Sequence, residues 1–596
     1  MSSDTVSNQS QKVAPNRNFS VWRYSFVITF MGFAVVLLTY RLVQLHVIEK
    51  DFLINQGEAR AIRFEDILAN RGIISDRNGE PLAVSTPVET VWMNPGEMLL
   101  GQAGFEDVGR LCQLLSISRQ WFEKKLERNA AREFVYLKRK VDPALARKVK
   151  ALKLPGIHIQ RDYKRFYPAA EVAAHVVGFV NIDERGQEGI ELAYDDWLNG
   201  VSGKKKVLKD RLGNVIKDLA LIRESRPGGD IQLALDMRLQ FIAYRELKAV
   251  VRAHRAKAGS VVVLDANTAE VLAMVNQPSY NPNNRLSLSV DSLRNRAVTD
   301  VFEPGSTVKP ITILAALETG KYATWSKIDT SSGLLRIGRK RIRDHRDYGV
   351  IDVATVVAKS SNVGTSKIAL DISGEKVWDM FYRLGLGQAS GTGFPGERMG
   401  KLPHPVKWKP LQVATLSYGY GLNVTALQLA QAYQVIANDG LRKPASLLVN
   451  DDEVRGEQVV DKEFAAQVRA ILQKVVEKGG TGTRAQVPAY KVGGKTGTVH
   501  SVGKSGYQDS QYISLFAGIA PADTPEIVMS IVIDGPQGDE YYGGEVAAPV
   551  FSRIANSAMR LLNVSPASVT DADKIEEKLE ALLSSEKTKK PGGRNG

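Results

Sequence analysis

The stretch Glu303-Pro304-Gly305-Ser306-Thr307-Val308-Lys309-Pro310, followed by the apolar run Ile311-Thr312-Ile313-Leu314-Ala315-Ala316-Leu317, decides how the second half of this chain folds. The apolar run is typical of a buried helix. Pro310 indicates where that helix begins, because proline fits only the first helical turn. We therefore expect the helix to start near Ser306. Ser306 and Lys309 then share one face, with about 5–6 Å between their Cβ atoms.

This pairing of a hydroxyl with an amine is typical of an activated nucleophile. A serine hydroxyl attacks only when a neighbouring base takes its proton. Lysine is such a base when burial or a second cation lowers its pKa from about 10.4. The same Ser-x-x-Lys spacing begins in polar stretches at Ser202, Ser373, Ser501 and Ser584. Ser306 alone has Pro-Gly before it and an apolar helix after it, so it is the candidate nucleophile.

Two further motifs carry polar side chains with a matching chemistry. Ser360-Ser361-Asn362 sets a hydroxyl and an amide two residues apart, before a run of small residues, and by itself is an ordinary helix cap. Val492-Gly493-Gly494-Lys495-Thr496-Gly497-Thr498-Val499 is typical of a strand, in which Thr496 and Thr498 share one face and Lys495 takes the other. We expect Gly497 to leave room where the backbone of a ligand approaches.

The surrounding pattern predicts a sheet packed against helices. A helix over Met237–Arg252 precedes a hairpin over Gly259–Val275. The third motif is followed by two more strands and a last helix, predicted at Tyr512–Ala520, Ile527–Ile533 and Val546–Leu562.

Composition limits the possible partners. The 596 residues exceed the length of one domain, and the net charge of +14 favours an anionic partner: nucleic acid, anionic lipid or a polyanionic wall. The chain has no zinc-finger spacing and no aromatic-basic motif, which disfavours nucleic acid. Its single cysteine, Cys112, excludes an intramolecular disulfide, and its apolar neighbours indicate a core position.

The N-terminal region predicts a membrane anchor. A charge-free apolar run lies between Arg23 and Arg41 and, with the apolar residues after it, reaches the length that spans a bilayer. No small-residue cleavage site follows, so we predict an uncleaved anchor at 24–45. Lys12, Arg17 and Arg23 place the tail, 1–23, in the cytoplasm and the rest of the chain outside. A buried helix of a soluble protein is the alternative.

The remaining boundaries follow from composition. Residues 46–225 predict a mixed pedestal domain, with a hairpin turn at Asn78-Gly79. Arginine and glutamate recur there beside glycines, which indicates structural ion pairs, and His175 has no partner at metal-ligand spacing. The linker Arg226-Pro227-Gly228-Gly229 leads into a C-terminal domain over 230–563. The charged tail, 564–596, is predicted to be disordered.

Ser-x-x-Lys, Ser-x-Asn and Lys-Thr-Gly, in this order, form the signature of penicillin-recognising acyl-serine enzymes. Over about residues 20–560 the chain resembles class B penicillin-binding proteins, above all their division-specific branch. Besides the motifs, the anchor, the stretches 71–83 and 165–191, and Tyr418-Gly419-Tyr420-Gly421 carry the resemblance. It implies an α+β fold: one transmembrane helix, a mixed α/β pedestal of dimerisation type, and a transpeptidase domain whose antiparallel sheet is flanked by helices, as in serine β-lactamases.

The resemblance also implies catalytic roles. Ser306 would attack the carbonyl of the penultimate D-alanine of a stem pentapeptide and form an acyl-enzyme. Lys309 would take the proton, and Ser360 would relay a proton to the leaving amine. The backbone N–H groups of Ser306 and Thr498 would form the oxyanion hole.

Substrate binding is implied for the other motif residues. Asn362 would hydrogen-bond the substrate's peptide amide. Lys495 would keep the base neutral through like charge, and it would add positive potential. Thr496, Gly497 and Thr498 would line the substrate site, with the two threonines binding the terminal carboxylate.

No metal or organic cofactor is implied. The implied ligands are D-Ala-D-Ala stem peptides and β-lactams, and the implied partners are the glycosyltransferase FtsW and other divisome proteins. The implied location is the bacterial inner membrane, single-pass, with the catalytic domain in the periplasm. An elongation-specific class B enzyme is the nearest alternative. A β-lactamase or membrane β-lactam sensor is disfavoured by the pedestal, and a non-catalytic divisome scaffold by the intact motifs.

Overall fold

The computed structural model describes residues 21–52, 62–101, 104–209, 215–285, 288–405, 408–450, 454–503 and 506–566. The chain forms two compact units, one of residues 1–68 and 202–225, the other of 69–201 and 226–596. The predicted pedestal, 46–225, includes residues of both units, and its boundaries stay a prediction. The predicted N-terminal tail up to residue 20, and the C-terminal tail from 567, lie outside the described residues.

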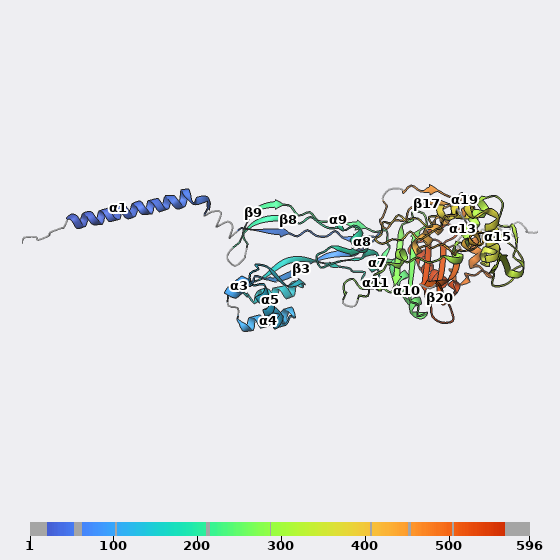
Figure 1. Cartoon of the computed structure of the whole chain (residues 1–596), viewed down its shortest axis with the longest axis horizontal. Coiled ribbons are helices and arrows are strands. Elements are labelled where there is room, and N and C mark those ends of the chain that lie inside the picture. The colour runs from blue at the N-terminus through green and yellow to red at the C-terminus, as the bar shows by residue number, and fades with distance from the viewer. Residues whose placement is uncertain are drawn as a thin grey trace, which may run out of the picture. The chain divides into compact units, whose positions relative to one another are not determined.

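The first unit contains the predicted anchor and a small sheet (Figure 1). Helix α1 (Val21–Val43) continues into a π-helical turn, η1 (Gln44–Ile48), so the helix begins and ends three residues outside the predicted 24–45. Among the described residues, Val21–Ile48 is the one helix long and apolar enough to cross a membrane, with a mean hydropathy of 2.1. The antiparallel sheet has the order β1-β8-β9, formed by Ile62–Ile67, Gly203–Lys209 and Val215–Arg223.

The second unit begins with a five-stranded sheet of order β10-β2-β3-β4, in which β5 also pairs with β3. The predicted turn at Asn78-Gly79 joins β2 to β3 as an antiparallel hairpin. Cys112 is buried in the apolar cluster beside this sheet, as predicted. The strands are β2 (Ile74–Ser75), β3 (Pro81–Met93), β4 (Val135–Val141), β5 (Ile157–Phe166) and β10 (Ile231–Gln232). The helices are α3 (Pro95–Leu100), α4 (Phe105–Leu115), α5 (Arg119–Arg128) and α6 (Pro143–Ala151).

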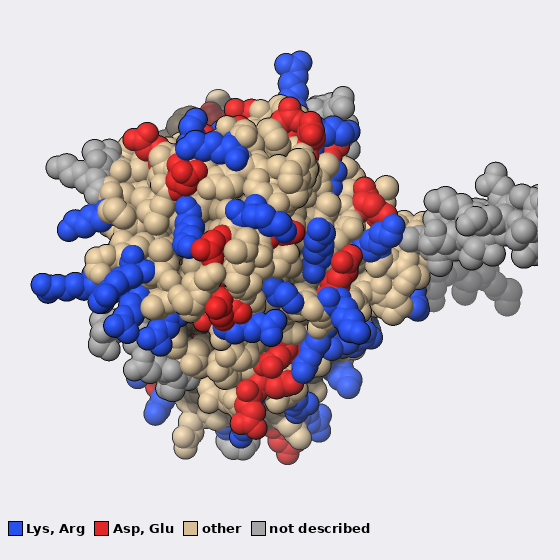
Figure 2. All heavy atoms as spheres, turned by 90° about the vertical axis from the view of Figure 1, so that its right-hand side faces the viewer, with Lys and Arg blue, Asp and Glu red and all other residues tan. Residues whose placement is uncertain are grey.

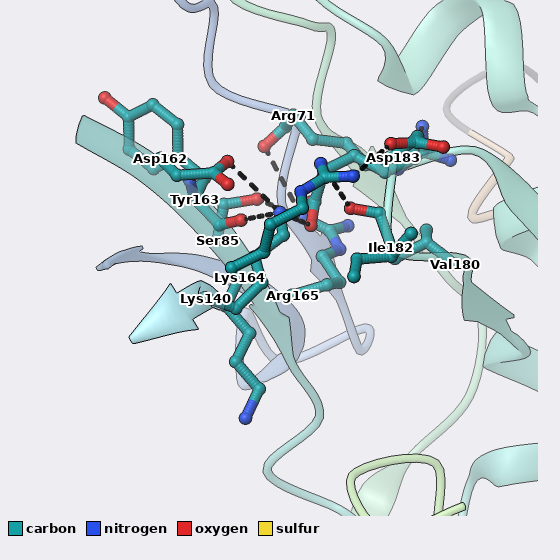
Figure 3. A network of polar contacts seen from close by, with 12 residues as sticks. Arg71, Ser85, Lys140, Asp162, Tyr163, Lys164, Arg165, Val180, Ile182 and Asp183 are labelled. Atoms are coloured by element: carbon teal, nitrogen blue, oxygen red, sulfur yellow. Dashed lines mark hydrogen bonds and ion pairs between the residues drawn. The ribbon is translucent and has the colours of Figure 1, made fainter. Parts of the chain in front are cut away.

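Buried ion pairs hold this part of the chain together, as the recurring arginines and glutamates predict. The carboxylate of Glu191 accepts from Arg71 at 2.6 Å and from Arg165 at 2.7 Å, and all three side chains are buried. Figure 3 shows the neighbouring contacts, in which Arg165 reaches the hydroxyl of Ser85. Removing one partner would leave a buried charge unpaired, which typically costs about 3–5 kcal/mol.

His175 is a structural residue, as predicted. Its ring is buried, and Nε2 donates to the carbonyl of Ser292 at 2.9 Å. Burial lowers its pKa to about 4, so the ring is neutral. His175 lies in α7 (Ala174–Val177), and the short elements after it are Phe179–Val180, Gly186–Glu188, Gly189–Ala193 and Asp195–Leu198 for β6, β7, α8 and α9.

The C-terminal domain is built on a five-stranded antiparallel sheet of order β12-β11-β21-β20-β19. Successive side chains of a strand point to opposite faces. Val261 and Val263 therefore pack with α10 and α21, while Val262 and Leu264 pack with α13 and α18. Its strands are β11 (Ala258–Asp265), β12 (Val271–Gln277), β19 (Gly493–Gly503), β20 (Gly506–Ala520) and β21 (Ile527–Asp534). The helices that pack on it are α10 (Met237–Ala253), α13 (Lys309–Glu318), α18 (Ala426–Ala437), α20 (Gly543–Val546) and α21 (Ala548–Leu561).

The predicted hairpin, the strands around it and the helix before it are confirmed, with two differences. Strand β20 begins at Gly506, before the predicted Tyr512, and the last predicted helix is divided into α20 and α21. The remaining helices of this domain are α11 (Val290–Leu293), α12 (Arg296–Thr299), α14 (Val353–Ala358), α15 (Asn362–Ile372), α16 (Gly374–Arg383), α17 (Pro410–Ser417) and α19 (Lys462–Val476). The α+β fold is thus confirmed.

Candidate active site

Ser306 lies in a short 3-10 turn, η2 (Gly305–Val308), and α13 begins only at Lys309. The sequence predicted a regular helix from Ser306. Gly305, at the entry to this turn, has a φ of +52°, a conformation that favours glycine. A Cβ at Gly305 would also meet Val499 of β19 at 2.4 Å. The nucleophile segment is thus pressed directly against the edge strand of the sheet.

Lys309 is completely buried at the start of α13, with Pro310 in the first turn as predicted. Its Nζ lies 2.5 Å from the carbonyl oxygen of Ser360, 2.8 Å from Asn362 Oδ1 and 3.1 Å from Ser360 Oγ. A neutral amine has two hydrogens and one lone pair, which match two carbonyl-type acceptors and one hydroxyl. Among the described residues, no hydrogen bond joins the Ser306 hydroxyl to Lys309; such catalytic contacts often tighten only when substrate binds.

The electrostatics of the site favour a neutral Lys309. Burial lowers the pKa of Lys309 well below its usual value, and the nearby Lys495 lowers it further, while Asp344 opposes the shift. Removing a charged amine from water disfavours its protonated form, and a like charge acts in the same direction. Lys309 therefore has the protonation state that a general base needs.

Lys495, on the edge strand β19, contacts the same Ser360 hydroxyl as Lys309. Its side chain is fully buried, Nζ donates to Ser360 Oγ at 3.0 Å, and burial lowers its pKa to about 7. Lys495 also donates to the carbonyl of Thr496 at 3.0 Å. Ser360 Oγ thus lies between the two lysine amines, which is the position of a proton relay.

The Ser360–Asn362 motif is held in an unusual backbone conformation. Ser360 has a φ of +57°, which is rare for a residue with a side chain and costs of order 1–3 kcal/mol. Ser361 caps α15, accepting from the N–H of Gly364 at 2.8 Å, and Asn362 is the first residue of that helix. Strain held at this point keeps the Ser360 hydroxyl aimed at both amines.

Asp344 is a positioning residue that the sequence did not reveal. Its carboxylate accepts from Ser361 Oγ at 2.5 Å and from the N–H groups of Asn362 and Val363 at 2.6 and 3.0 Å. It thereby fixes the first turn of α15 and the motif before it. In the sequence Asp344 is one acidic residue in a basic stretch, with no spacing that connects it to the motif.

The two threonines of the third motif are held by partners that the sequence also missed. Thr496 Oγ1 donates to Thr481 Oγ1 at 3.0 Å. The N–H of Gly543, at the start of α20, donates to Thr498 Oγ1 at 2.9 Å. The Thr498 hydroxyl therefore keeps its hydrogen for an acceptor such as a carboxylate. Because β19 is at the edge of the sheet, one alternating set of its backbone N–H groups does not pair with β20.

Gly497 serves a different purpose from the one expected. A Cβ there would meet Thr307 Cγ2 at 2.9 Å, Leu515 Cβ at 3.1 Å and the carbonyl oxygen of Pro304 at 3.2 Å. The space at this position is therefore taken by the nucleophile segment rather than by a ligand. Glycine is required here so that β19 and the turn around Ser306 can approach each other.

The fold and this arrangement define a class. A serine at the start of a buried helix, two buried lysines joined through a second serine, and a Lys-Thr-Gly edge strand are the parts of a penicillin-recognising acyl-serine enzyme. The chain belongs to the family of the penicillin-binding protein transpeptidase domain, whose model matches residues 259–556, and residues 66–233 match the penicillin-binding protein dimerisation domain.

Relatives of known name cover nearly the whole chain. It is 40% identical to the peptidoglycan D,D-transpeptidase FtsI of Escherichia coli over 94% of this chain and 95% of that protein. It is 41% identical to a probable peptidoglycan D,D-transpeptidase, PbpC, of Pseudomonas aeruginosa over 94% of this chain and 98% of that one. The crystal structure of penicillin-binding protein 3 from Mycobacterium tuberculosis, complexed with aztreonam, is similar with a TM-score of 0.66 and 29% identity, covering 84% of this chain and 98% of that one.

Proposed function

We propose that this protein is a peptidoglycan D,D-transpeptidase that cross-links stem peptides through an acyl-enzyme on Ser306 and is inhibited by β-lactams. The observation that carries the proposal is the convergence of two buried amines, Lys309 and Lys495, on Ser360 Oγ. A structural ion pair brings opposite charges together. Two buried lysines at one hydroxyl instead disfavour each other's charged form, and such lowered pKa values are typical of sites that transfer protons. The FtsI relatives support the same reaction.

Acylation follows from these positions. Ser306 Oγ attacks the carbonyl carbon of the penultimate D-alanine, and neutral Lys309 takes the proton. The backbone N–H groups of Ser306 and Thr498 stabilise the oxyanion. The proton then passes through Ser360 to the nitrogen of the terminal D-alanine, the C–N bond breaks, and D-alanine leaves.

Deacylation repeats the steps with a new nucleophile. An amine of a neighbouring stem peptide attacks the ester carbonyl, loses its proton towards Lys309, and releases Ser306 with its hydroxyl restored. Water in place of the amine would give carboxypeptidase activity instead of a cross-link.

Substrate recognition uses the other motif residues. Lys495 supplies positive potential, and the hydroxyl of Thr498 donates to the terminal carboxylate of the substrate. The hydroxyl of Thr496, which donates to Thr481 without substrate, turns to the same carboxylate when the substrate binds. The amide nitrogen of Asn362 has two hydrogens. It donates one to the carbonyl of Arg343 and donates the other to the substrate's peptide group. A β-lactam that presents a carboxylate and a strained amide fits the same contacts and remains bound to Ser306.

We place the reaction at the division septum, outside the inner membrane. Helix α1 anchors the chain once, with its N-terminus in the cytoplasm and the catalytic domain in the periplasm. The FtsI resemblance favours FtsW and other divisome proteins as partners, and it favours division over elongation.

Labelling with a fluorescent penicillin tests the proposal. We expect Ser306→Ala to abolish covalent labelling and cross-linking in a folded protein. The matched control is Ser373→Ala, which alters another Ser-x-x-Lys pair outside the site and should label normally. Covalent labelling that persists in Ser306→Ala would assign the nucleophile to another residue and refute the mechanism.

A further inference from the structure

A strongly basic hairpin lies next to the active site. It consists of β14 (Leu334–Ile337) and β15 (Lys340–Arg343), paired antiparallel. Its apolar side chains, such as Ile342, face the domain. The exposed cations of the hairpin and the loop after it are Arg336, Arg339, Lys340, Arg341, Arg343 and Arg346.

The hairpin places like charges directly opposite each other. Arg336 faces Arg341 across the two strands, and Arg343 follows on the same side of the hairpin. Like charges at opposed positions destabilise a strand pair. Within the part of the chain that the structure describes, none of these three arginines has a carboxylate at ion-pair distance. An uncompensated guanidinium pair on an exposed strand face is suited to an anionic ligand.

The end of the hairpin lies at the rim of the active site. The Asn362 amide nitrogen donates to the carbonyl oxygen of Arg343 at 3.1 Å. Two residues further on, the ring of His345 packs edge-to-face against Tyr542, with 6.3 Å between the ring centroids. Tyr542 directly precedes Gly543, whose N–H holds Thr498. The basic strand β15 therefore ends beside Asn362, and the loop after it reaches the neighbour of Gly543, which holds Thr498.

We propose that the exposed face of this hairpin binds free carboxylates of the peptidoglycan stem peptide, on the residues that precede its D-Ala-D-Ala end. The inference rests on the proposed function and names what else of the substrate the enzyme recognises. Arginine matches carboxylates with a planar pair of donors. An extended peptide advances about 3.3 Å per residue, so acidic residues two to four positions before the reacting bond lie about 7–13 Å from it.

The wider surface agrees with an anionic ligand. Figure 2 shows the end of the C-terminal domain, where basic side chains are spread more widely than acidic ones. Such a field raises the local concentration of an anionic ligand and speeds its association. A peptide substrate is favoured over a lipid surface because the hairpin ends at Arg343, whose carbonyl accepts from Asn362, the residue that the proposed function assigns to the substrate's peptide group.

Binding of uncross-linked stem pentapeptides to the Ser306→Ala protein, which cannot turn them over, tests the inference. One peptide carries free carboxylates before D-Ala-D-Ala, and a matched peptide carries carboxamides there. We expect Arg336→Gln/Arg339→Gln/Arg341→Gln to weaken binding of the carboxylate peptide about tenfold and to change binding of the carboxamide peptide less than twofold. Raising the salt from 0.1 to 1 M, which shortens the Debye length from about 10 to about 3 Å, should remove the difference.

Matched variants separate this inference from the proposed function. Arg147→Gln/Lys148→Gln/Lys150→Gln removes the same charge from exposed positions on α6 and should bind both peptides normally. With Ser306 intact, penicillin acylation of the hairpin variant reports on the catalytic site alone. Failure of acylation in the unaltered protein would refute the function. Binding to anionic phospholipid vesicles is measured on the same variants. The inference would be overturned by equal losses of binding for both peptides, by no loss for either, or by a hairpin variant that loses only vesicle binding.

Discussion

At the scale of single residues, the site depends on two lysines whose charges are disfavoured by burial. Lys309 and Lys495 are both fully buried, and their amines share Ser360 Oγ. Burial lowers the pKa of Lys309 well below its usual value and lowers the pKa of Lys495 to about 7. Their roles therefore predict different consequences of substitution and of pH.

Replacing Lys309 by arginine should remove nearly all acylation. A guanidinium keeps its positive charge but does not lose its proton in a protein, so no base remains. General-base catalysis contributes about 10²–10⁴ in rate, and the second-order rate of penicillin acylation should fall by that factor. Lys376→Arg, at an exposed lysine outside the site, is the control. Near-normal acylation of Lys309→Arg would exclude Lys309 as the base.

The pH dependence of acylation should reveal both lysines. Lys309 acts when it is deprotonated. Because its pKa is lowered well below the usual value of a lysine, it stays deprotonated and active at pH values where an ordinary lysine is protonated. Lys495 adds positive potential only when protonated, and with a pKa of about 7 that contribution is lost as the pH rises through neutrality. The acylation rate per unit of free enzyme should therefore decline on the alkaline side near pH 7, and Lys495→Arg should shift this decline upward. A decline unchanged in Lys495→Arg would assign it to another group.

At the scale of elements, the edge position of β19 decides what it offers. A strand paired on one side only has backbone donors to spare, and Gly497 brings this edge against the turn that carries Ser306. The side chains of β19 and its backbone can thus contact the substrate separately.

Two substitutions at Thr498 separate these contacts. Thr498→Val keeps shape and backbone but removes the hydrogen bond to the substrate carboxylate, roughly 1.5–3 kcal/mol, together with the one that Thr498 Oγ1 accepts from Gly543. At about 1.4 kcal/mol per decade, this lowers acylation on the order of ten- to a hundredfold. Thr498→Pro also deletes the N–H and should cost a further ~10²–10³. Acylation rates are measured on both, with circular dichroism to establish folding. Equal losses in two folded variants would remove the backbone of Thr498 from the oxyanion hole.

At the scale of the whole molecule, the anchor and the site are built by different units. Helix α1 belongs to the first unit, and every residue that contacts Ser360 Oγ belongs to the second. Since the groups that surround Ser360 Oγ all come from the second unit, we expect acylation not to require α1.

Removing residues 1–48 should therefore give a soluble protein that reacts with penicillin within about twofold of the full-length rate. The same truncation should fail to support division, because the proposed function assigns location and contacts with membrane partners to α1. Acylation of the purified protein and complementation of a depleted strain are the two measurements. A folded truncated protein that no longer reacts would show that the anchor shapes the site.

The sequence alone determined the elements that carry the candidate nucleophile and its base. Pro310 and the apolar run located helix α13, which begins at Lys309 directly after the turn of Ser306. Strand patterns located the hairpin of β11 and β12 and the strand of Lys495. These features depend on local rules: where proline is tolerated, and which side chains alternate along a strand. The 3-10 turn at Ser306 was missed because it depends on contact between Gly305 and β19, far away in sequence.

Only the tertiary structure decided how the site is held and charged. Asp344, Thr481 and Gly543 reach their partners across 17, 15 and 45 residues of chain, and no periodic pattern marks a single polar residue at such distances. The lowered pKa values of the two lysines likewise arise from burial that neither motif contains. Local patterns specify helices and strands, whereas desolvation and long-range hydrogen bonds exist only once the chain has packed.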